Sequence, residues 1–256
     1  MSNMKKILDM TDSEIVDTIQ SGKLNICVIG IGRIGLPTAL SFANSGLPTI
    51  GVDINEKLVE MINSRNFPLN DEPGYDIIFD KVINEKKFKA TTHFSEGVNY
   101  SDVIVLSLPT PMDEKNIPDY SSLLSIAKKL HDEISDGKLI IIESTVEPGF
   151  VENDFLKIIE GDDNKLKLGK NFALGVCPET ANPGQILNDF ERLPRLVGAM
   201  DEHTQNLITK IYKHVFTVEL IPMPNCKTAN AVKLTTNVFR DLNIAFVNEL
   251  ALIFEK

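Results

Sequence analysis

One glycine-rich turn and one aspartate have the residue types and the spacing to bind a dinucleotide. The turn has the sequence GIGRIG (residues 30–35), and it follows an apolar run and precedes a helix-like stretch. Its three glycines permit a tight turn, the close approach of a pyrophosphate to the backbone, and close packing of a helix on a sheet. Asp53 ends the next apolar run, 18 residues after Gly35, where a carboxylate accepts hydrogen bonds from ribose hydroxyls and favours NAD over NADP. The residues expected to hold NAD are those of the turn and of this aspartate, together with three that follow later apolar runs: Gly30, Gly32, Arg33, Ile34, Gly35, Asp53, Pro109, Thr110 and Thr145.

Further polar residues follow apolar runs, at the sheet edge where open α/β proteins bind ligands. Pro109 and Thr110 come directly after the run 102–108, and Thr145 and Glu179 follow later runs. Hydroxyls and amides at such positions can contact a cofactor or substrate, and the carboxylate of Glu179 is suited to general-base chemistry or to positioning a water. Taken alone, each residue is equally compatible with a turn that binds nothing.

A lysine and an asparagine share one face of the last predicted helix. Lys233 and Asn237 are spaced i, i+4 in the stretch 226–256, which has no Pro or Gly and keeps helical spacing. An ammonium group on that face can stabilise a developing alkoxide. Spacing alone, however, favours a solvated lysine on a helix surface.

The elements that must position these residues alternate between strand and helix. Short apolar runs predict strands, and stretches with 3.6-residue periodicity predict helices. Their alternation predicts an α/β fold, with a Rossmann-like, doubly wound parallel sheet followed by a long helix that begins an α-helical dimerisation domain. The expected strands span residues 24–29, 47–52, 89–92, 102–108, 139–143, 172–176, 195–198 and 217–221. The expected helices span residues 5–20, 33–45, 55–63, 123–134, 203–214 and 226–256.

Length, composition and charge exclude several classes of protein. The chain has 256 residues, of which 43% are hydrophobic and 24% charged, as in a globular protein with a sizeable core. A net charge of −10 without a basic stripe argues against nucleic-acid binding. The apolar runs are shorter than the roughly 20 residues of a membrane span, and residues 1–22 lack the apolar core of a secretory signal, so we expect a cytoplasmic protein. Cys27, Cys177 and Cys226 are too widely spaced for a disulfide framework or a metal cluster, so we expect reduced thiols and no metal.

Several motifs in a fixed order resemble the UDP-glucose/GDP-mannose dehydrogenase family, which oxidises the C6 alcohol of a nucleotide-linked sugar to a carboxylate with two NAD molecules. The resemblance runs from Leu24 to Lys256. An ordered set of this kind is far more specific than a single glycine motif. The motifs are GIGRIGLP (30–37), Asp53, LPTP (108–111), ESTVEPG (143–149), CPETANPG (177–184), PRLVG (194–198) and KLTTNVFRDLNIAFVNEL (233–250).

The resemblance also implies roles for individual residues. Thr145 and Glu179 would hold a catalytic water, and Lys233 and Asn237 would be their polar partners and stabilise negative charge on oxygen. The stretch 239–245 is similar to the branch of the family that acts on UDP-N-acetylhexosamines. UDP-N-acetylmannosamine is the expected substrate, with UDP-N-acetylglucosamine and UDP-glucose as alternatives.

The chain is expected to contain three parts: a helical extension (residues 1–23), an NAD-binding Rossmann domain (24–222) and the start of a central helical domain (223–256). The apolar face of the last part would be exposed unless paired, which predicts a homodimer. In the family, the nucleophilic cysteine lies in a glycine-rich motif beyond the long helix, and none of the three cysteines here lies in such a motif. We therefore expect the sequence to be truncated at Lys256 and the chain alone to be inactive or nearly so.

Three alternatives stay open. The glycine motif can be an ordinary turn with Asp53 as a helix cap. The chain can be a non-catalytic NAD-binding module whose last helix recruits a partner. It can also be another Rossmann enzyme, such as a 6-phosphogluconate or 3-hydroxyacid dehydrogenase, although the pattern of residues 233–250 argues against this.

Overall fold

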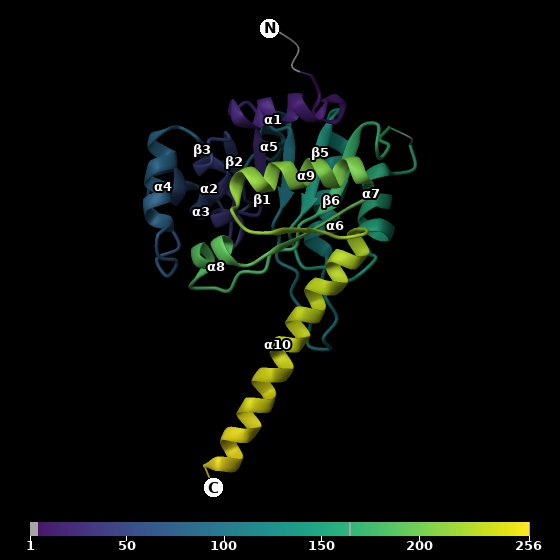
Figure 1. Ribbon diagram of the computed structural model, residues 1–256. Helices are drawn as coiled ribbons and strands as arrows, with labels where there is room; N and C mark the ends of the chain where they lie inside the picture. Colours follow the sequence, from purple (N-terminus) through teal and green to yellow (C-terminus); the bar gives the residue numbers. More distant parts are fainter. Residues whose placement is uncertain (1–4, 164, 256) are drawn as a thin grey trace.

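An eight-stranded sheet organises the chain in the computed structural model, which describes residues 5–163 and 165–255. The strand order is β3-β2-β1-β4-β5-β6-β7-β8, and Figure 1 labels β3, β2, β1, β5 and β6 of this series. The order reverses between β1 and β4, and ligands of open α/β sheets bind beyond the carboxyl ends of the strands at such a point. The strands are β1 (Ile26–Ile29), β2 (Thr49–Val52), β3 (Phe88–Thr91), β4 (Val103–Leu106), β5 (Lys138–Ile142), β6 (Phe172–Val176), β7 (Arg195–Ala199) and β8 (Leu220–Pro222).

Helices cover both faces of the sheet, which confirms the predicted doubly wound fold. The central strands are apolar along their whole length because each face is buried: in β1, Ile26 and Val28 join one core and Cys27 and Ile29 the other. The first core contains side chains of α1 (Asp12–Gln20), α2 (Gly35–Asn44), α3 (Glu56–Asn63), α4 (Tyr75–Asn84), α8 (Ile186–Arg192) and α9 (Glu202–Val215). The second contains side chains of α5 (Phe94–Tyr100), α6 (Ser121–Glu133), the π-helical turn η2 (Val151–Phe155), α7 (Leu156–Glu160) and the start of α10 (Cys226–Phe254).

One pair of strands departs from the predicted parallel arrangement. β6 and β7 are antiparallel, with Gly175 opposite Ala199 and Val176 opposite Gly198. The chain leaves the sheet at the carboxyl end of β6, passes through α8 and re-enters the sheet at the same end, so β7 runs opposite to β6. The two strands also approach closely, since a Cβ added at Gly175 would lie 2.8 Å from the carbonyl oxygen of Gly198.

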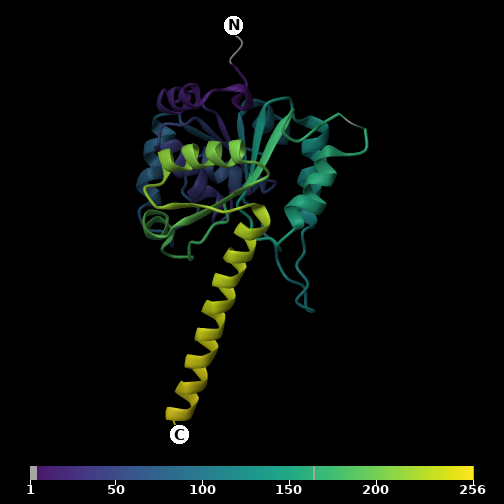
Figure 2. The ribbon, with the colours of Figure 1, turned by 45° about the vertical axis from the view of Figure 1, so that its right-hand side comes forward.

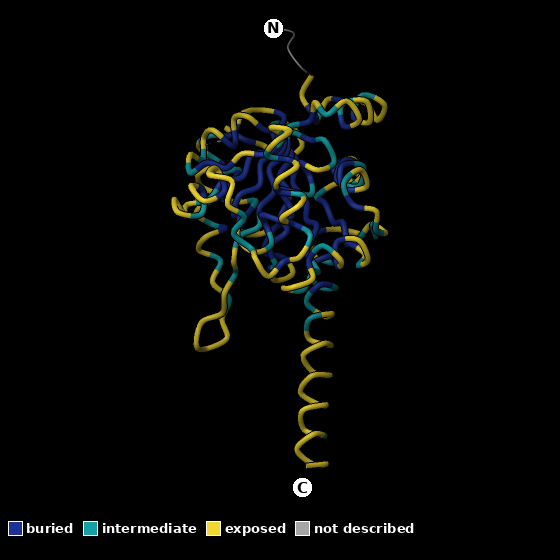
Figure 3. The backbone as a smooth tube through the Cα atoms, turned by 90° about the vertical axis from the view of Figure 1, so that its left-hand side faces the viewer, coloured by how far each residue is buried: buried dark blue, intermediate teal, exposed yellow. Residues whose placement is uncertain are grey.

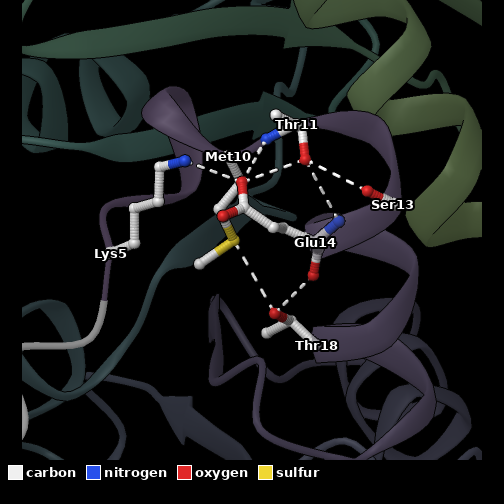
Figure 4. A network of polar contacts seen from close by, with 6 residues as sticks. All are labelled: Lys5, Met10, Thr11, Ser13, Glu14 and Thr18. Atoms are coloured by element: carbon white, nitrogen blue, oxygen red, sulfur yellow. Dashed lines mark hydrogen bonds and ion pairs between the residues drawn. The ribbon is translucent and has the colours of Figure 1, made fainter.

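The N-terminal extension consists of a 3-10 turn, η1 (Ile7–Asp9), followed by α1, rather than one continuous helix. A reciprocal capping box fixes the start of α1: Thr11 N donates to Glu14 Oε2 at 2.7 Å, and Glu14 N donates to Thr11 Oγ1 at 3.4 Å (Figure 4). Lys5 pairs with the same carboxylate at 2.7 Å, and the hydrogen bonds from Lys5 and Thr11 together lower the pKa of Glu14 to about 2. Ile15 and Ile19 anchor the helix in the core. Residues 1–4 of the expected extension lie outside the described residues.

The last helix leaves the body of the molecule at the end opposite to α1 (Figures 1 and 2). α10 is 29 residues long, and its exposure rises soon after its first two turns (Figure 3). Lys256 of the predicted helix lies outside the described residues. Within the described part of the chain, no helix combines the length and the apolarity needed to cross a bilayer. The exposed large apolar residues of α10 are Val238, Phe239, Leu242, Ile244, Phe246, Val247, Leu252, Ile253 and Phe254.

Candidate active site

The glycine turn has the geometry that a dinucleotide requires. Gly30 has φ +86°, and a Cβ there would lie 2.5 Å from the carbonyl oxygen of Ser107. A Cβ on Gly35 would lie 1.8 Å from the carbonyl oxygen of Gly30, so only glycine allows α2 to begin this close to the turn. At Gly32, by contrast, a Cβ would meet no atom within 4 Å. The space above Gly32 is therefore open to an approaching phosphate.

The start of α2 adds a second feature that suits an anion. Ile34 occupies the N-cap position, and no described side chain caps the helix, so its first N–H groups lack a side-chain acceptor. Arg33 stands beside it, with its side chain 43% exposed, and pairs with Asp71 and, at 3.3 Å, with Glu72. The hydrogen bond from Arg33 lowers the pKa of the Asp71 carboxyl. The turn thus presents a guanidinium and a helix N-terminus at one edge of the sheet.

Asp53 lies at the carboxyl end of β2 and braces the glycine turn. Its Oδ2 accepts a hydrogen bond from Ile31 N at 3.0 Å, and its Oδ1 accepts one from Asn55 N at 2.9 Å. The alternative of Asp53 as the helix cap is wrong, because Asn55 caps α3 by accepting from Leu58 N at 3.2 Å. A carboxylate has about four acceptor positions, so Asp53 retains capacity for ribose hydroxyls.

The loops after β4 and β5 are joined by hydrogen bonds. Thr110 Oγ1 donates to the carbonyl oxygen of Thr145 at 2.8 Å. Ser144 Oγ accepts from Leu108 N at 2.9 Å and donates to Leu108 O at 2.8 Å. Pro109 is exposed at the start of its loop, and Thr145 is half-buried. The structure therefore brings three of the predicted residues, Pro109, Thr110 and Thr145, to the same sheet edge as the glycine turn.

Glu179 and Lys233 are two ionisable groups that are both removed from solvent. Glu179 is 9% exposed and accepts a hydrogen bond from Ala181 N, and Lys233 is 8% exposed. Burial raises the pKa of Glu179 and lowers the pKa of Lys233, and the charge of each partner opposes the shift of the other. The interpretation of Lys233 from spacing alone, a solvated lysine, is wrong.

Asn237 lies one turn beyond Lys233 on α10 and is half-buried, and its side chain forms no hydrogen bond with the described residues. The same helix also reaches the loop that carries Glu179, because Arg240 donates to Asn182 Oδ1. The structure thus buries Glu179 and Lys233 and leaves Asn237 only half-buried.

A buried ionic cluster beneath this edge was not predicted. Glu143 at the end of β5 accepts from Arg195 at 3.2 Å, from Tyr212 Oη at 2.9 Å and from Thr38 Oγ1 at 3.1 Å. The guanidinium of Arg195 also lies 3.9 Å from the ring centre of Phe216. The sequence did offer a signal, because Glu143 ends one apolar run and Arg195 begins another, and buried charges require partners.

Comparison with known proteins places this geometry in a family. The sequence model of the UDP-glucose/GDP-mannose dehydrogenase family, NAD binding domain, matches residues 24–216. The chain belongs to this family. UDP-N-acetyl-D-mannosamine dehydrogenase of Campylobacter jejuni is 35% identical over 238 residues, which are 90% of this chain and 57% of that protein.

Solved structures agree with the sequence comparison. UDP-D-ManNAc dehydrogenase from Pyrococcus horikoshii superposes with a TM-score of 0.83 at 34% identity, over 90% of this chain and 54% of that one. GDP-mannose dehydrogenase from Pseudomonas aeruginosa superposes with a TM-score of 0.82 at 26% identity, over 88% of this chain and 51% of that one. The chain spans about half the length of the curated relatives it matches.

Family membership confirms two predictions, the resemblance itself and NAD as the cofactor of this domain. It also decides against another class of Rossmann enzyme. 3-Hydroxyisobutyrate dehydrogenase from Mycobacterium tuberculosis superposes with a TM-score of 0.61 at only 14% identity, which shows a shared fold alone.

Proposed function

We propose that this chain is the NAD-binding part of a UDP-sugar 6-dehydrogenase whose preferred substrate is UDP-N-acetylmannosamine. The observation that carries the proposal is the burial of both Lys233 and Glu179, with Glu179 following β6 at the sheet edge that also holds the glycine turn. Relatives named UDP-N-acetyl-D-mannosamine dehydrogenase, at about 35% identity, support this choice of sugar.

The residues divide the work between cofactor and substrate. The glycine turn, Arg33 and Asp53 would hold the pyrophosphate and the adenosine ribose, with Pro109 and Thr110 beside the cofactor. Bound NAD supplies the acceptor for the hydride removed from the sugar.

The remaining site residues act on the substrate and on water. Thr145 and Glu179 hold a water, and because burial raises the pKa of Glu179, its carboxylate is a stronger base toward that water than an ordinary glutamate. Lys233 stabilises negative charge that develops on the substrate oxygen, assisted by Asn237, and burial strengthens that interaction because the local dielectric constant is low.

We further propose that residues 24–222 form the NAD-binding domain behind a helical extension (1–23), and that residues 223–256 begin a central dimerisation domain. The exposed apolar residues of α10 support a homodimer through this helix, because a patch of this kind is rarely left in water. The protein would act in the cytoplasm, in the synthesis of precursors for surface polysaccharides.

The test uses the whole protein, with NAD and each of UDP-N-acetylmannosamine, UDP-N-acetylglucosamine and UDP-glucose, and follows formation of reduced cofactor. We expect the first sugar to give the highest kcat/KM. Lys233→Met should lower kcat by about 100-fold or more, whereas Lys227→Met, an exposed lysine on the same helix, should leave it unchanged. Cofactor binding without turnover of any UDP-sugar would instead indicate a non-catalytic NAD-binding module.

A further inference from the structure

A buried glutamate outside the predicted site joins two loops that are distant in sequence. The side chain of Glu72 is 0% exposed. Its Oε1 accepts from Gly184 N at 2.6 Å, and its Oε2 accepts from Ile186 N at 3.1 Å. Its Oε1 also lies 3.3 Å from a terminal nitrogen of Arg33. Glu72 therefore contacts Arg33 of the glycine turn on one side and the loop before α8 on the other.

The loop before α8 is the one that carries Glu179. Near its start, the Glu179 carboxylate accepts from Ala181 N, and in its middle Asn182 donates to Asp189 Oδ2 through both its backbone and its side-chain nitrogen, at 2.8 and 2.9 Å. Beyond Asn182, the carboxylate of Glu72 accepts the hydrogen bonds from the backbone N–H groups of Gly184 and Ile186. The position of Glu179 thus depends on a loop whose far end is anchored by Glu72.

Close packing supports the same contact between the two segments. Gly74 has φ +89°, and a Cβ there would lie 2.6 Å from Leu187 Cδ2 in α8. The segment that contains Glu72 therefore lies directly against the start of α8. Because this packing does not involve the carboxylate, a substitution of Glu72 that preserves its volume should leave the two segments in contact.

We infer that Glu72 is a positioning residue that couples dinucleotide binding at the glycine turn to the placement of Glu179, an inference that rests on the proposed function. Arg33 uses one terminal nitrogen for both of its carboxylate partners, and a guanidinium has five N–H donors. A phosphate at the turn can therefore bond to Arg33 while the contact with Glu72 persists. Phosphate binding would immobilise Arg33, Arg33 would hold Glu72, and Glu72 would hold the loop of Glu179.

Amide hydrogen exchange of Gly184 and Ile186, measured on this chain with and without saturating NAD, tests the coupling. In the unchanged chain we expect NAD to slow exchange of these amides by roughly fivefold or more. Arg33→Met should leave their exchange without NAD nearly unchanged, since the backbone bonds to Glu72 remain, and should abolish the slowing by NAD. Glu72→Gln should speed their exchange by roughly tenfold even without NAD, because an amide offers one acceptor oxygen where a carboxylate offers two.

Asp71→Asn is the matched control, because Asp71 pairs with the same arginine but accepts no hydrogen bond from the described residues of the loop. This variant should retain the effect of NAD on Gly184 and Ile186. If calorimetry detects no NAD binding by the unchanged chain, the proposed function fails and the coupling with it. If NAD binds but does not alter exchange of these amides, or if Arg33→Met retains the slowing, the coupling alone is refuted.

Discussion

Glu143 is the acidic side chain that neutralises Arg195 in the protein interior. Replacing Glu143 with glutamine should destabilise the chain severely. Both residues are almost fully buried, and Glu143 accepts hydrogen bonds from three side chains. Glutamine has nearly the same volume, so the substitution removes charge without creating a cavity. Arg195 keeps its charge under all ordinary conditions and would lose its counter-ion.

The expected magnitude follows from that geometry. Removing one partner of a buried ion pair costs about 3–5 kcal/mol, because the other charge stays buried and unpaired. The same cluster offers a milder variant: Tyr212→Phe removes one neutral donor at 2.9 Å from Glu143 and leaves the ion pair intact, at a cost of about 1–2 kcal/mol. Glu143→Gln should therefore consume a large part of the roughly 5–15 kcal/mol that a domain has available, and Tyr212→Phe should not.

Urea unfolding of the three proteins, followed by circular dichroism, measures both costs. The expected order of stability is the unchanged chain, then Tyr212→Phe, then Glu143→Gln. Burial raises the pKa of Glu143, whereas the charge of Arg195 opposes that rise. A cost for Glu143→Gln below about 1 kcal/mol would mean that Glu143 is already protonated in the folded chain, and the ionic account of the cluster would be wrong.

Four further substitutions have distinct outcomes. Gly35→Ala should destabilise the chain by about 3 kcal/mol or more in urea unfolding, because its Cβ meets the carbonyl oxygen of Gly30 at 1.8 Å, whereas Gly32→Ala should leave stability within about 0.5 kcal/mol and weaken NAD binding in calorimetry. Lys233→Met should raise the urea midpoint, because burying the charged ammonium group destabilises the folded chain. Burial lowers the pKa of Lys233, so this destabilisation is absent above pH 10.5, grows as the pH falls below that value, and levels off below the lowered pKa. A gain that is independent of pH would contradict this cause. Leu242→Glu should reduce self-association in light scattering, and an unchanged chain that is strictly monomeric at high concentration would refute the proposed dimer helix.

Local patterns predicted the parts of the fold that depend on local causes. The strands beside the glycine turn are continuous apolar runs because both faces are covered, and the turn itself requires glycine at Gly30 and Gly35 for steric reasons. Patterns of this kind are visible within a few residues of sequence. The sequence therefore predicted the glycine turn, Asp53 beside it and the doubly wound sheet.

Features that depend on distant partners were missed. The helices α5, α7 and α8 have seven residues or fewer, and tertiary packing stabilises helices of this length more than their periodicity does. The direction of β7 depends on where the connection through α8 returns, which no local pattern records. Burial of Lys233 was missed from spacing for the same reason, because the covering elements come from elsewhere in the chain.

Cofactor titration by calorimetry tests the central claim, that the glycine turn and Asp53 bind NAD. The chain should bind NAD and should bind NADP at least about tenfold more weakly, because a carboxylate at Asp53 repels a 2′-phosphate. Asp53→Ala should abolish the preference and weaken NAD binding, whereas Asp80→Ala, an exposed carboxylate on α4, should change neither. Binding of NAD that is unaffected by Asp53→Ala, or no binding of either dinucleotide, would contradict the account.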